Sequence, residues 1–196
     1  MYKQILSKFN VYDQVGYLMV GSVSLIVLYL DSLFLDVIFP KFALNSSIIW
    51  LIATYFLGHV IQSIANIIIK EKKEDFNEKE KKILEIAKEF FDIKNLSEGE
   101  IWSLCYMMAF AKDITGQIST FDAYYSLYRG WFVIFALESL FLLLLNIFKW
   151  FNFTYLILFL ISNFLTILFF RRKKRFYSYL KIKVLQTFIL LRKVKS

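Results

Sequence analysis

Three side chains that can ionise lie deep inside apolar stretches of this sequence. Asp31 lies in the stretch 16–39, His59 in 46–69 and Glu138 in 130–148. Each is within about three residues of the midpoint of its stretch, or roughly 4.5 Å along a helix. An ionisable group in hydrocarbon is costly and marks a candidate functional site. We expect the histidine to pair with a carboxyl group, because pairing lowers the cost of burying both.

A row of polar residues accompanies the histidine. Tyr55, His59, Gln62 and Asn66 are spaced i, i+4, i+7 and i+11, so they share one face of a helix. With the aspartate and the glutamate above, this row forms a candidate intramembrane polar cluster. Four readings fit it: hydrogen bonds that hold the helices together, a hydrated conduction path, acid–base catalysis, or contact with a ligand or lipid headgroup. The spacing alone leaves all four open.

A second candidate patch is aromatic and basic. Its members are Tyr124, Tyr125, Tyr128, Arg129, Arg171, Arg172, Lys173, Lys174 and Arg175. Tyrosine rings and long cationic side chains are typical of the membrane–water interface. We therefore expect this patch to anchor the chain and to contact anionic lipid headgroups or a cytoplasmic partner. A phosphate contact at Arg129 is the functional alternative.

Motifs of common enzyme classes are missing from the sequence. It contains no glycine-rich phosphate loop, no dinucleotide-binding fingerprint and no serine nucleophile elbow. The single cysteine, Cys105, and the single histidine rule out an intrachain disulfide and zinc sites that need several imidazoles. We predict no catalytic residue, no cofactor and no metal site.

The elements that must position these residues are apolar helices. Of the 196 residues, 58% are hydrophobic, and apolar runs cover about 16–39, 46–69, 130–148 and 153–170. Each run approaches the roughly 20 residues that a helix needs to cross a bilayer. The runs lack the alternation of barrel strands. The predicted fold is therefore all-α, a four-transmembrane-helix bundle with a small helical cytoplasmic insert and a basic amphipathic C-terminal helix.

The distribution of lysine and arginine predicts the orientation. Basic residues flank the start of the first run, the end of the second, the start of the third and the end of the fourth. The opposite ends carry only Lys41 and Lys149. By the positive-inside rule, both termini lie in the cytoplasm and the loops 40–45 and 149–152 are short outside turns. The expected location is the inner membrane.

Four segments follow from this layout. They are a transmembrane hairpin at 1–69, a cytoplasmic insert at 70–128, a second hairpin at 129–170 and a tail at 171–196. Ten basic and no acidic residues in the tail indicate affinity for anionic lipid rather than nucleic acid. The tail helix is expected to lie on the membrane surface or to continue the fourth span.

The insert carries its own helix-start signals. Asn77 or Asp75 is an expected N-cap, Ser97 with Glu100 fits a capping box, and a third start is expected at 119–122. The third helix would run into the third span. On the second helix, the buried face is expected to hold four residues: Ile101, Leu104, Cys105 and Met108. We expect the insert to pack against the membrane, the tail or a second subunit.

Three sequence blocks also carry a family resemblance. They are YDQVGYLMVG at 12–21, YFLGHVIQ at 55–62 and FDAYYSLYRG at 121–130. Their layout resembles small multi-span membrane proteins of prokaryotic antiviral defence islands, such as the accessory proteins beside type VI-B CRISPR effectors. The blocks cover under a fifth of the chain, and none is a catalytic signature. The resemblance implies an auxiliary or effector role at the inner membrane.

The leading functional hypothesis is a non-enzymatic defence protein that forms a homo-oligomer and perturbs the membrane or opens a pore. The polar cluster would line or gate the path. A scaffold that recruits a soluble cytoplasmic defence protein is the second hypothesis. A lipid-modifying enzyme that uses His59 with an adjacent carboxyl group is the third.

Overall fold

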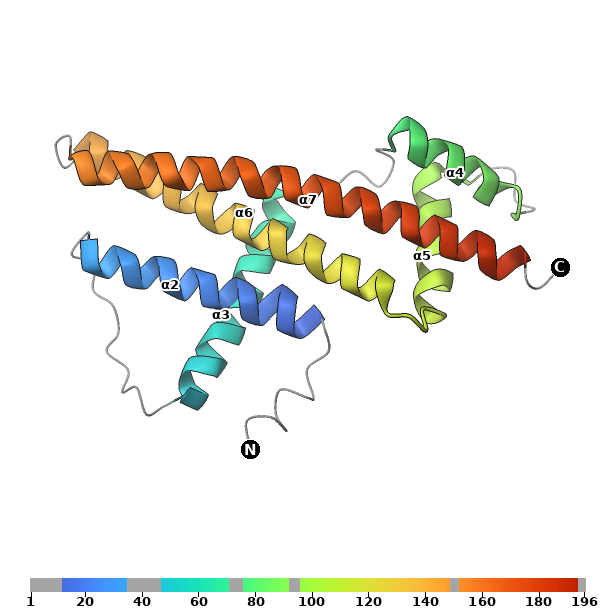
Figure 1. Cartoon of the computed structure of the whole chain (residues 1–196), viewed down its shortest axis with the longest axis horizontal. Coiled ribbons are helices and arrows are strands. Elements are labelled where there is room, and N and C mark those ends of the chain that lie inside the picture. Colours follow the sequence, from blue (N-terminus) through green and yellow to red (C-terminus); the bar gives the residue numbers. More distant parts are fainter. Residues whose placement is uncertain (1–11, 35–46, 71–75, 92–95, 149–151, 194–196) are drawn as a thin grey trace. The chain divides into compact units, whose positions relative to one another are not determined.

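The computed structural model describes residues 12–34, 47–70, 76–91, 96–148 and 152–193. Every regular element in these ranges is helical, which confirms the all-α prediction (Figure 1). In chain order they are the π-helix η1 (Asp13–Leu18) and the α-helices α2 (Met19–Phe34), α3 (Ser47–Ile68), α4 (Glu78–Lys88), α5 (Glu98–Ala111), α6 (Gln117–Phe148) and α7 (Phe153–Lys193). The predicted turn at 40–45 and most of that at 149–152 lie outside the described residues.

Four helical stretches are long and apolar enough to cross a membrane. They are Asp13–Phe34, Ser47–Ile68, Gln117–Phe148 and Phe153–Lys193. They coincide with the four predicted runs, so the chain is a membrane protein by length and composition. The third stretch begins before its apolar run and the fourth extends beyond its own. The described part of the basic tail therefore continues the fourth span within the single helix α7, one of the two arrangements expected for it.

The chain divides into two compact units. The span unit comprises Met1–Ile68 and Ala123–Lys173, and the insert–tail unit comprises Ile69–Asp122 and Lys174–Ser196. The division falls within α6 and within α7. Each unit is described by itself below.

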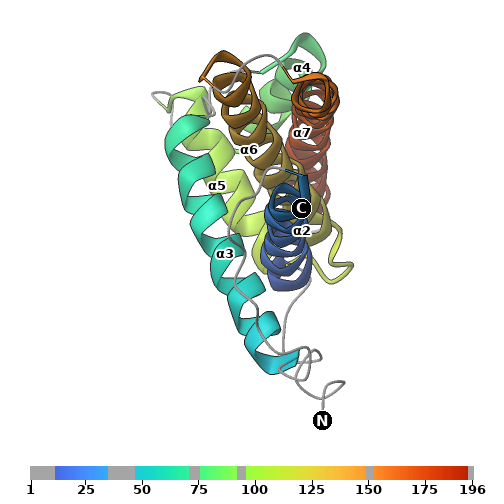
Figure 2. The ribbon, with the colours of Figure 1, turned by 90° about the vertical axis from the view of Figure 1, so that its left-hand side faces the viewer.

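In the span unit, α3 packs closely against α2 (Figures 1 and 2) and against η1, which precedes α2. Two glycines permit this approach. A Cβ atom on Gly21 would lie 1.8 Å from the carbonyl oxygen of Thr54, and one on Gly58 would lie 2.1 Å from that of Tyr17. Both distances are far below van der Waals contact, and the atoms met are backbone. Only glycine therefore permits this approach, the role that small residues commonly have between membrane helices.

The insert–tail unit has its own hydrophobic core. It is built from one face each of α4 and α5, the start of α6 and the tail part of α7. Its buried members are Phe76, Leu84, Ala87, Ile101, Trp102, Cys105, Ala109, Ile118, Leu180, Val184, Leu185 and Phe188. On α7 these members recur at i, i+4, i+5 and i+8, one face of a helix. The expectation that the insert packs against the tail is confirmed.

Two of the three predicted helix starts are confirmed. Asn77 caps α4 and Ser97 caps α5, and each forms a reciprocal capping box with the glutamate three residues later. The third start was wrong, because α6 begins at Gln117. The carboxylate of Asp113 accepts a hydrogen bond from the amide of Ile118 at 2.7 Å. Gly116 allows the turn before α6 because its φ of 65° is left-handed.

The predicted buried face of α5 was correct for two residues and wrong for two. Ile101 and Cys105 are buried, whereas Leu104 and Met108 are 37% and 38% exposed. The core meets α5 along the row 101, 105 and 109, joined by Trp102. Leu104 and Met108 fall beside that row, so hydrophobicity alone was an insufficient guide.

Candidate functional site

Gln62 is the centre of a polar junction in the span unit. Its Nε2 donates to the carbonyl oxygens of Gly16 at 3.0 Å and Ser126 at 2.8 Å. Its Oε1 accepts from an Nη atom of Arg129 at 2.9 Å. The side chain is only 3% exposed. A buried amide with both ends bonded stabilises a unique arrangement, so Gln62 fixes α3 to η1 and to α6.

The π-helical turn η1 supplies one wall of this junction. Its carbonyl at Gly16 accepts from Gln62, and Tyr12 beside it accepts a hydrogen bond from the hydroxyl of Ser126 at 3.0 Å. Short π-helical segments are frequently found at functional sites. No pattern in the sequence predicted this turn or the role of Ser126.

Gly130 completes the close packing at the junction. A Cβ atom there would lie 2.7 Å from a methyl carbon of Val20 and 3.0 Å from Nε2 of Gln62. The side chains would have to shift to admit even alanine. The glycine therefore keeps α6 close enough for the amide of Gln62 to reach the backbone of Ser126.

The three sequence blocks that carry the family resemblance meet at this junction. The block 12–21 supplies Gly16, the block 55–62 supplies Gln62, and the block 121–130 supplies Ser126 and Arg129. Residues that are far apart in the chain thus form one hydrogen-bonded unit. The pattern in the sequence corresponds to a packing motif among three helices.

His59 lies between two tyrosine rings. Its ring stacks on Tyr17 with centroids 3.8 Å apart, and Tyr55 meets it edge-on at 4.5 Å. Stacked and edge-to-face rings stabilise helix contacts beyond the area that they bury. Asn66, the last member of the predicted row, is exposed. The row therefore has helix-packing contacts at three members and an exposed side chain at the fourth.

Asp31 and Glu138 are joined to each other. A side-chain hydrogen bond links the two carboxyl groups, and Asp31 is buried. Such a bond requires that one carboxyl group carries a proton, because a carboxylate has no donor. Among the residues that the structure describes, no hydrogen bond joins His59 to either group. The predicted six-residue cluster is thus divided into separate contacts.

The predicted aromatic and basic patch is also divided. The guanidinium of Arg129 lies over the buried ring of Tyr125, 5.3 Å from its centroid, while it donates to Gln62. Tyr128 stacks near Phe169, whereas Tyr124 is exposed. Arg129 is therefore part of the helix junction.

Four of the five basic residues at 171–175 are exposed. They are Arg171, Arg172, Lys174 and Arg175. Lys173 is buried, and its ammonium group lies 5.1 Å from the ring centroid of Phe170. The exposed four form the part of the predicted patch that anionic headgroups could reach.

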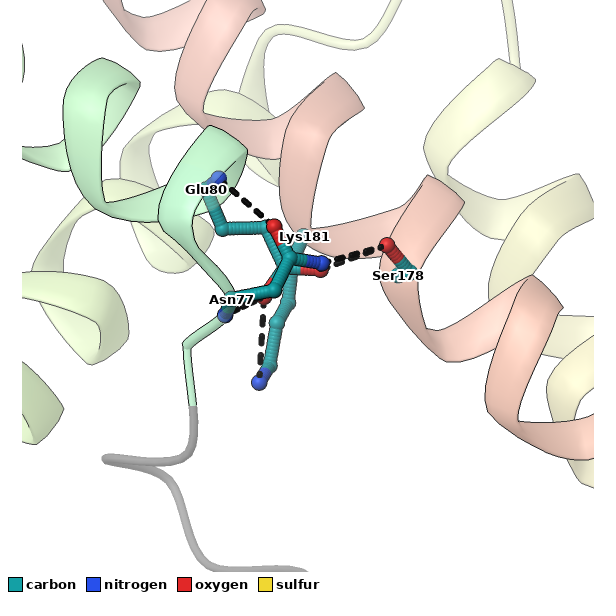
Figure 3. Close-up of polar contacts among 4 residues, drawn as sticks. All are labelled: Asn77, Glu80, Ser178 and Lys181. Carbon is teal, nitrogen blue, oxygen red and sulfur yellow. Dashed lines mark hydrogen bonds and ion pairs between the residues drawn. The ribbon is translucent and has the colours of Figure 1, made fainter.

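In the insert–tail unit, a buried ion pair fixes α4 to the tail (Figure 3). The ammonium of Lys181 lies 3.7 Å from Oε2 of Glu80, and the side chains are 2% and 3% exposed. The hydroxyl of Ser178 donates to Oε1 of Glu80 at 2.5 Å. The backbone amide and side-chain amide of Asn77 donate to the same carboxylate at 3.1 and 2.8 Å.

Aromatic rings enclose the cationic end of this pair. The ammonium of Lys181 lies 4.4 Å from the ring centroid of Phe76 and 4.5 Å from that of Tyr177. A cation over aromatic faces is stabilised by the ring quadrupoles, and most strongly where water is excluded. The sequence predicted Asn77 or Asp75 as the cap of this helix, but nothing in it indicated that the carboxylate of Glu80 would complete the cap and also bind Lys181.

Cys105 lies in the core of the same unit. Burial raises the pKa of its thiol to about 12, although Arg192 nearby opposes this effect. A thiol of this kind is almost wholly protonated near neutral pH and reacts slowly. Cys105 is therefore a packing residue and a sensitive reporter of unfolding.

The described residues contain no group of three or more His, Cys, Asp or Glu side chains that could hold a metal ion. Comparisons with protein-family models, curated proteins and solved structures gave no match to this chain. Its function must be inferred from the geometry above.

Proposed function

We propose that this chain is a non-enzymatic inner-membrane protein of antiviral defence that holds a docking module for a soluble cytoplasmic protein at the membrane. The observation that carries the proposal is the separate core of the insert–tail unit, fixed by the buried pair of Glu80 and Lys181. A module with its own core and buried ion pair presents a defined surface to a partner.

The contacts of the span unit support an anchoring role. Gln62 and His59, the central members of the polar row, are held by other side chains and backbone of the same chain. A conduction path along this row would require these side chains to face a lumen instead. The row therefore favours helix–helix adhesion, which suits a rigid anchor.

The orientation in this proposal places both termini and the insert in the cytoplasm. The positive-inside distribution of lysine and arginine supports it. It is tested by cysteine accessibility in intact cells, in a Cys105→Ala background. A membrane-impermeant maleimide should label Ala43→Cys and spare Lys112→Cys until the membrane is permeabilised. The reverse pattern would refute the orientation.

The defence setting is supported by the resemblance of the three blocks, which converge on the Gln62 junction. It is tested by phage plaque counts on the native host with and without the gene. We expect protection to disappear with Glu80→Gln, which opens the insert–tail unit. It should persist with the paired variant Asp31→Asn and Glu138→Gln. Equal plaque counts with and without the gene would reject a defence role.

A membrane-perturbing homo-oligomer is the second candidate. The hydrogen-bonded carboxyl groups of Asp31 and Glu138 favour it. Burying a carboxyl group in an apolar membrane helix costs free energy, so such groups are candidates for a functional role such as ion passage. Dye leakage from liposomes that contain the full chain tests it. Leakage that the paired variant Asp31→Asn and Glu138→Gln abolishes would favour this candidate over the anchor.

The lipid-modifying alternative required His59 within hydrogen-bond reach of a carboxyl group. In the described residues, His59 stacks on Tyr17 and the carboxyl groups bind each other. This arrangement gives no support to acid–base catalysis by the pair.

A further inference from the structure

The insert–tail unit contains a groove between α4 and the tail part of α7. Its volume is about 410 Å³. It is lined by Ile83, Ile86, Lys183, Gln186, Thr187, Ile189 and Leu190. The hydrophobic core lies beneath it, since Ile83 and Ile189 also pack against the core cluster.

The outer edges of the groove are apolar and exposed. Leu190 is 64% exposed and Ile86 is 44% exposed. Exposed apolar side chains that gather at a hollow mark a candidate protein-binding site. These two residues come from different helices, so a ligand that covers both must lie along the groove.

The single charged side chain that lines the groove is basic, and most of the exposed charged neighbours of the lining residues are basic too. Lys183 lines it, and none of its lining residues is acidic. On α4, the exposed Lys79 precedes Ile83 by four residues and the exposed Lys82 precedes Ile86 by four, the spacing of neighbours on a helix face, whereas the exposed Glu89 follows Ile86 by three. On α7, Lys193 follows Leu190 by three residues and is also exposed. Residues 174–196 contain no acidic side chain at all.

We propose that this groove binds an amphipathic helix that carries acidic side chains beside its apolar stripe, presented by the soluble partner. This inference rests on the proposed docking function and specifies its surface. A hollow between two helices accepts side chains spaced i, i+3, i+4 and i+7, the recognition mode of helix-in-groove complexes. A flat anionic bilayer would contact a ridge more readily than a hollow. The lysines would steer and orient the acidic helix.

Synthetic helical peptides test the proposal against the full chain in nanodiscs of neutral phosphatidylcholine. One peptide carries leucines at i, i+3, i+4 and i+7 flanked by glutamates. A second replaces every glutamate by lysine, and a third scrambles the leucines while keeping the glutamates. Fluorescence anisotropy should show binding of the first peptide only.

Matched variants locate the binding surface. Lys183→Glu and Leu190→Asn should each weaken binding of the acidic peptide by about tenfold, which is about 1.4 kcal/mol. The controls are Lys112→Glu and Met107→Asn, because both residues are exposed in this unit and neither lines the groove. Met107 is 68% exposed, close to the value for Leu190. Both controls should stay within about twofold of the unmodified chain, because surface changes outside the contact have little effect.

Three outcomes would overturn the proposal. The first is equal binding of the acidic and basic peptides. The second is an equal loss of peptide affinity in the groove variants and the control variants. The third is that the peptide does not bind, whereas phosphatidylserine vesicles do, and that Lys183→Glu and Leu190→Asn abolish this vesicle binding. The third outcome would assign the groove to lipid. If the peptides fail but a soluble partner still associates with the chain in membranes, the groove inference fails and the docking function stands.

Discussion

The buried pair of Glu80 and Lys181 makes a quantitative prediction about the insert–tail unit. Glu80→Gln keeps the side-chain shape and an oxygen acceptor, but it leaves the ammonium of Lys181 without its counter-charge. Lys181→Met keeps the aliphatic stem and removes the cation, so the carboxylate of Glu80 is left without its counter-charge. The double variant removes both charges.

The expected costs follow from the partners that remain. Removing one member of a buried pair typically costs about 3–5 kcal/mol, and we expect Glu80→Gln to fall in this range. Lys181→Met should cost less, about 1–3 kcal/mol, because Glu80 keeps hydrogen bonds from Asn77 and Ser178. The double variant should lie within about 1 kcal/mol of the unmodified chain, since a buried pair replaced by neutral groups is often neutral.

The native cysteine measures these differences directly. Cys105 is the chain's only cysteine and is fully buried in the core of this unit. A maleimide labels this thiol at neutral pH only when the insert–tail unit opens. The ratio of its labelling rate to the rate in the denatured chain gives the free energy of opening of this unit. The experiment uses the full chain in nanodiscs, with Lys112→Gln as an exposed control.

Two results would refute the reasoning. If Glu80→Gln and the unmodified chain labelled at the same rate, the pair would not stabilise the unit. If the double variant were as unstable as the sum of the single variants, the two side chains would act independently and the 3.7 Å contact would have no energetic meaning.

Further predictions concern the span unit and the start of α6. Gly58→Ala should strongly lower the melting temperature of the chain in detergent, because the new Cβ atom would collide with a backbone carbonyl group. Gly16→Ala should lower the melting temperature far less, because the nearest atom to its new Cβ atom would be 3.3 Å away. Gln62→Leu should destabilise the chain by about 2–3 kcal/mol in the same assay, because its buried partners lose their hydrogen bonds. Asn66→Leu, at an exposed position, should leave the stability unchanged. Equal effects of the two substitutions would contradict the stabilising role of the Gln62 hydrogen bonds. Hydrogen bonds from Thr115 and the amides of residues 117–119 outweigh burial and hold the pKa of the Asp113 carboxyl below its ordinary 3.8. Asp113→Ala should therefore lower the free energy of opening at the start of α6 by about 1 kcal/mol at pH 7. This difference from the unmodified chain should vanish as the pH falls from about 4 through the lower pKa of the folded state. Hydrogen exchange of residues 117–122 measures it. A difference that grew in acid would contradict the assigned charge.

Local signals predicted the elements well. The four apolar runs were long enough to identify as spans, and the caps at Asn77 and Ser97 follow from side chains that bond within their own first turn. The start of α6 was misplaced because its acceptor, Asp113, lies four residues before the helix. A capping pattern confined to one turn cannot detect such a loop.

Tertiary partners could not be read from spacing. Depth along the spans suggested that His59 would meet a carboxyl group, but depth does not fix which faces of the helices adjoin. The close approach of α3 to η1 and α2 at Gly58 and Gly21 sets that rotation, and it brings the ring of Tyr17 onto His59. The sequence indicated that Gly58 would let another helix approach, and the structure confirms this. Gly21 was the missed signal, because no other glycine lies four residues from it in the usual GxxxG spacing.

We propose that the insert–tail unit docks a soluble protein at the membrane. Flotation of proteoliposomes that carry the full chain, mixed in turn with each purified soluble product of the neighbouring genes, tests it most directly. We predict that one product floats with the vesicles, that Glu80→Gln abolishes its flotation, and that the vesicles retain their dye. Flotation of none of the products, together with dye leakage, would contradict the claim and favour the membrane-perturbing oligomer.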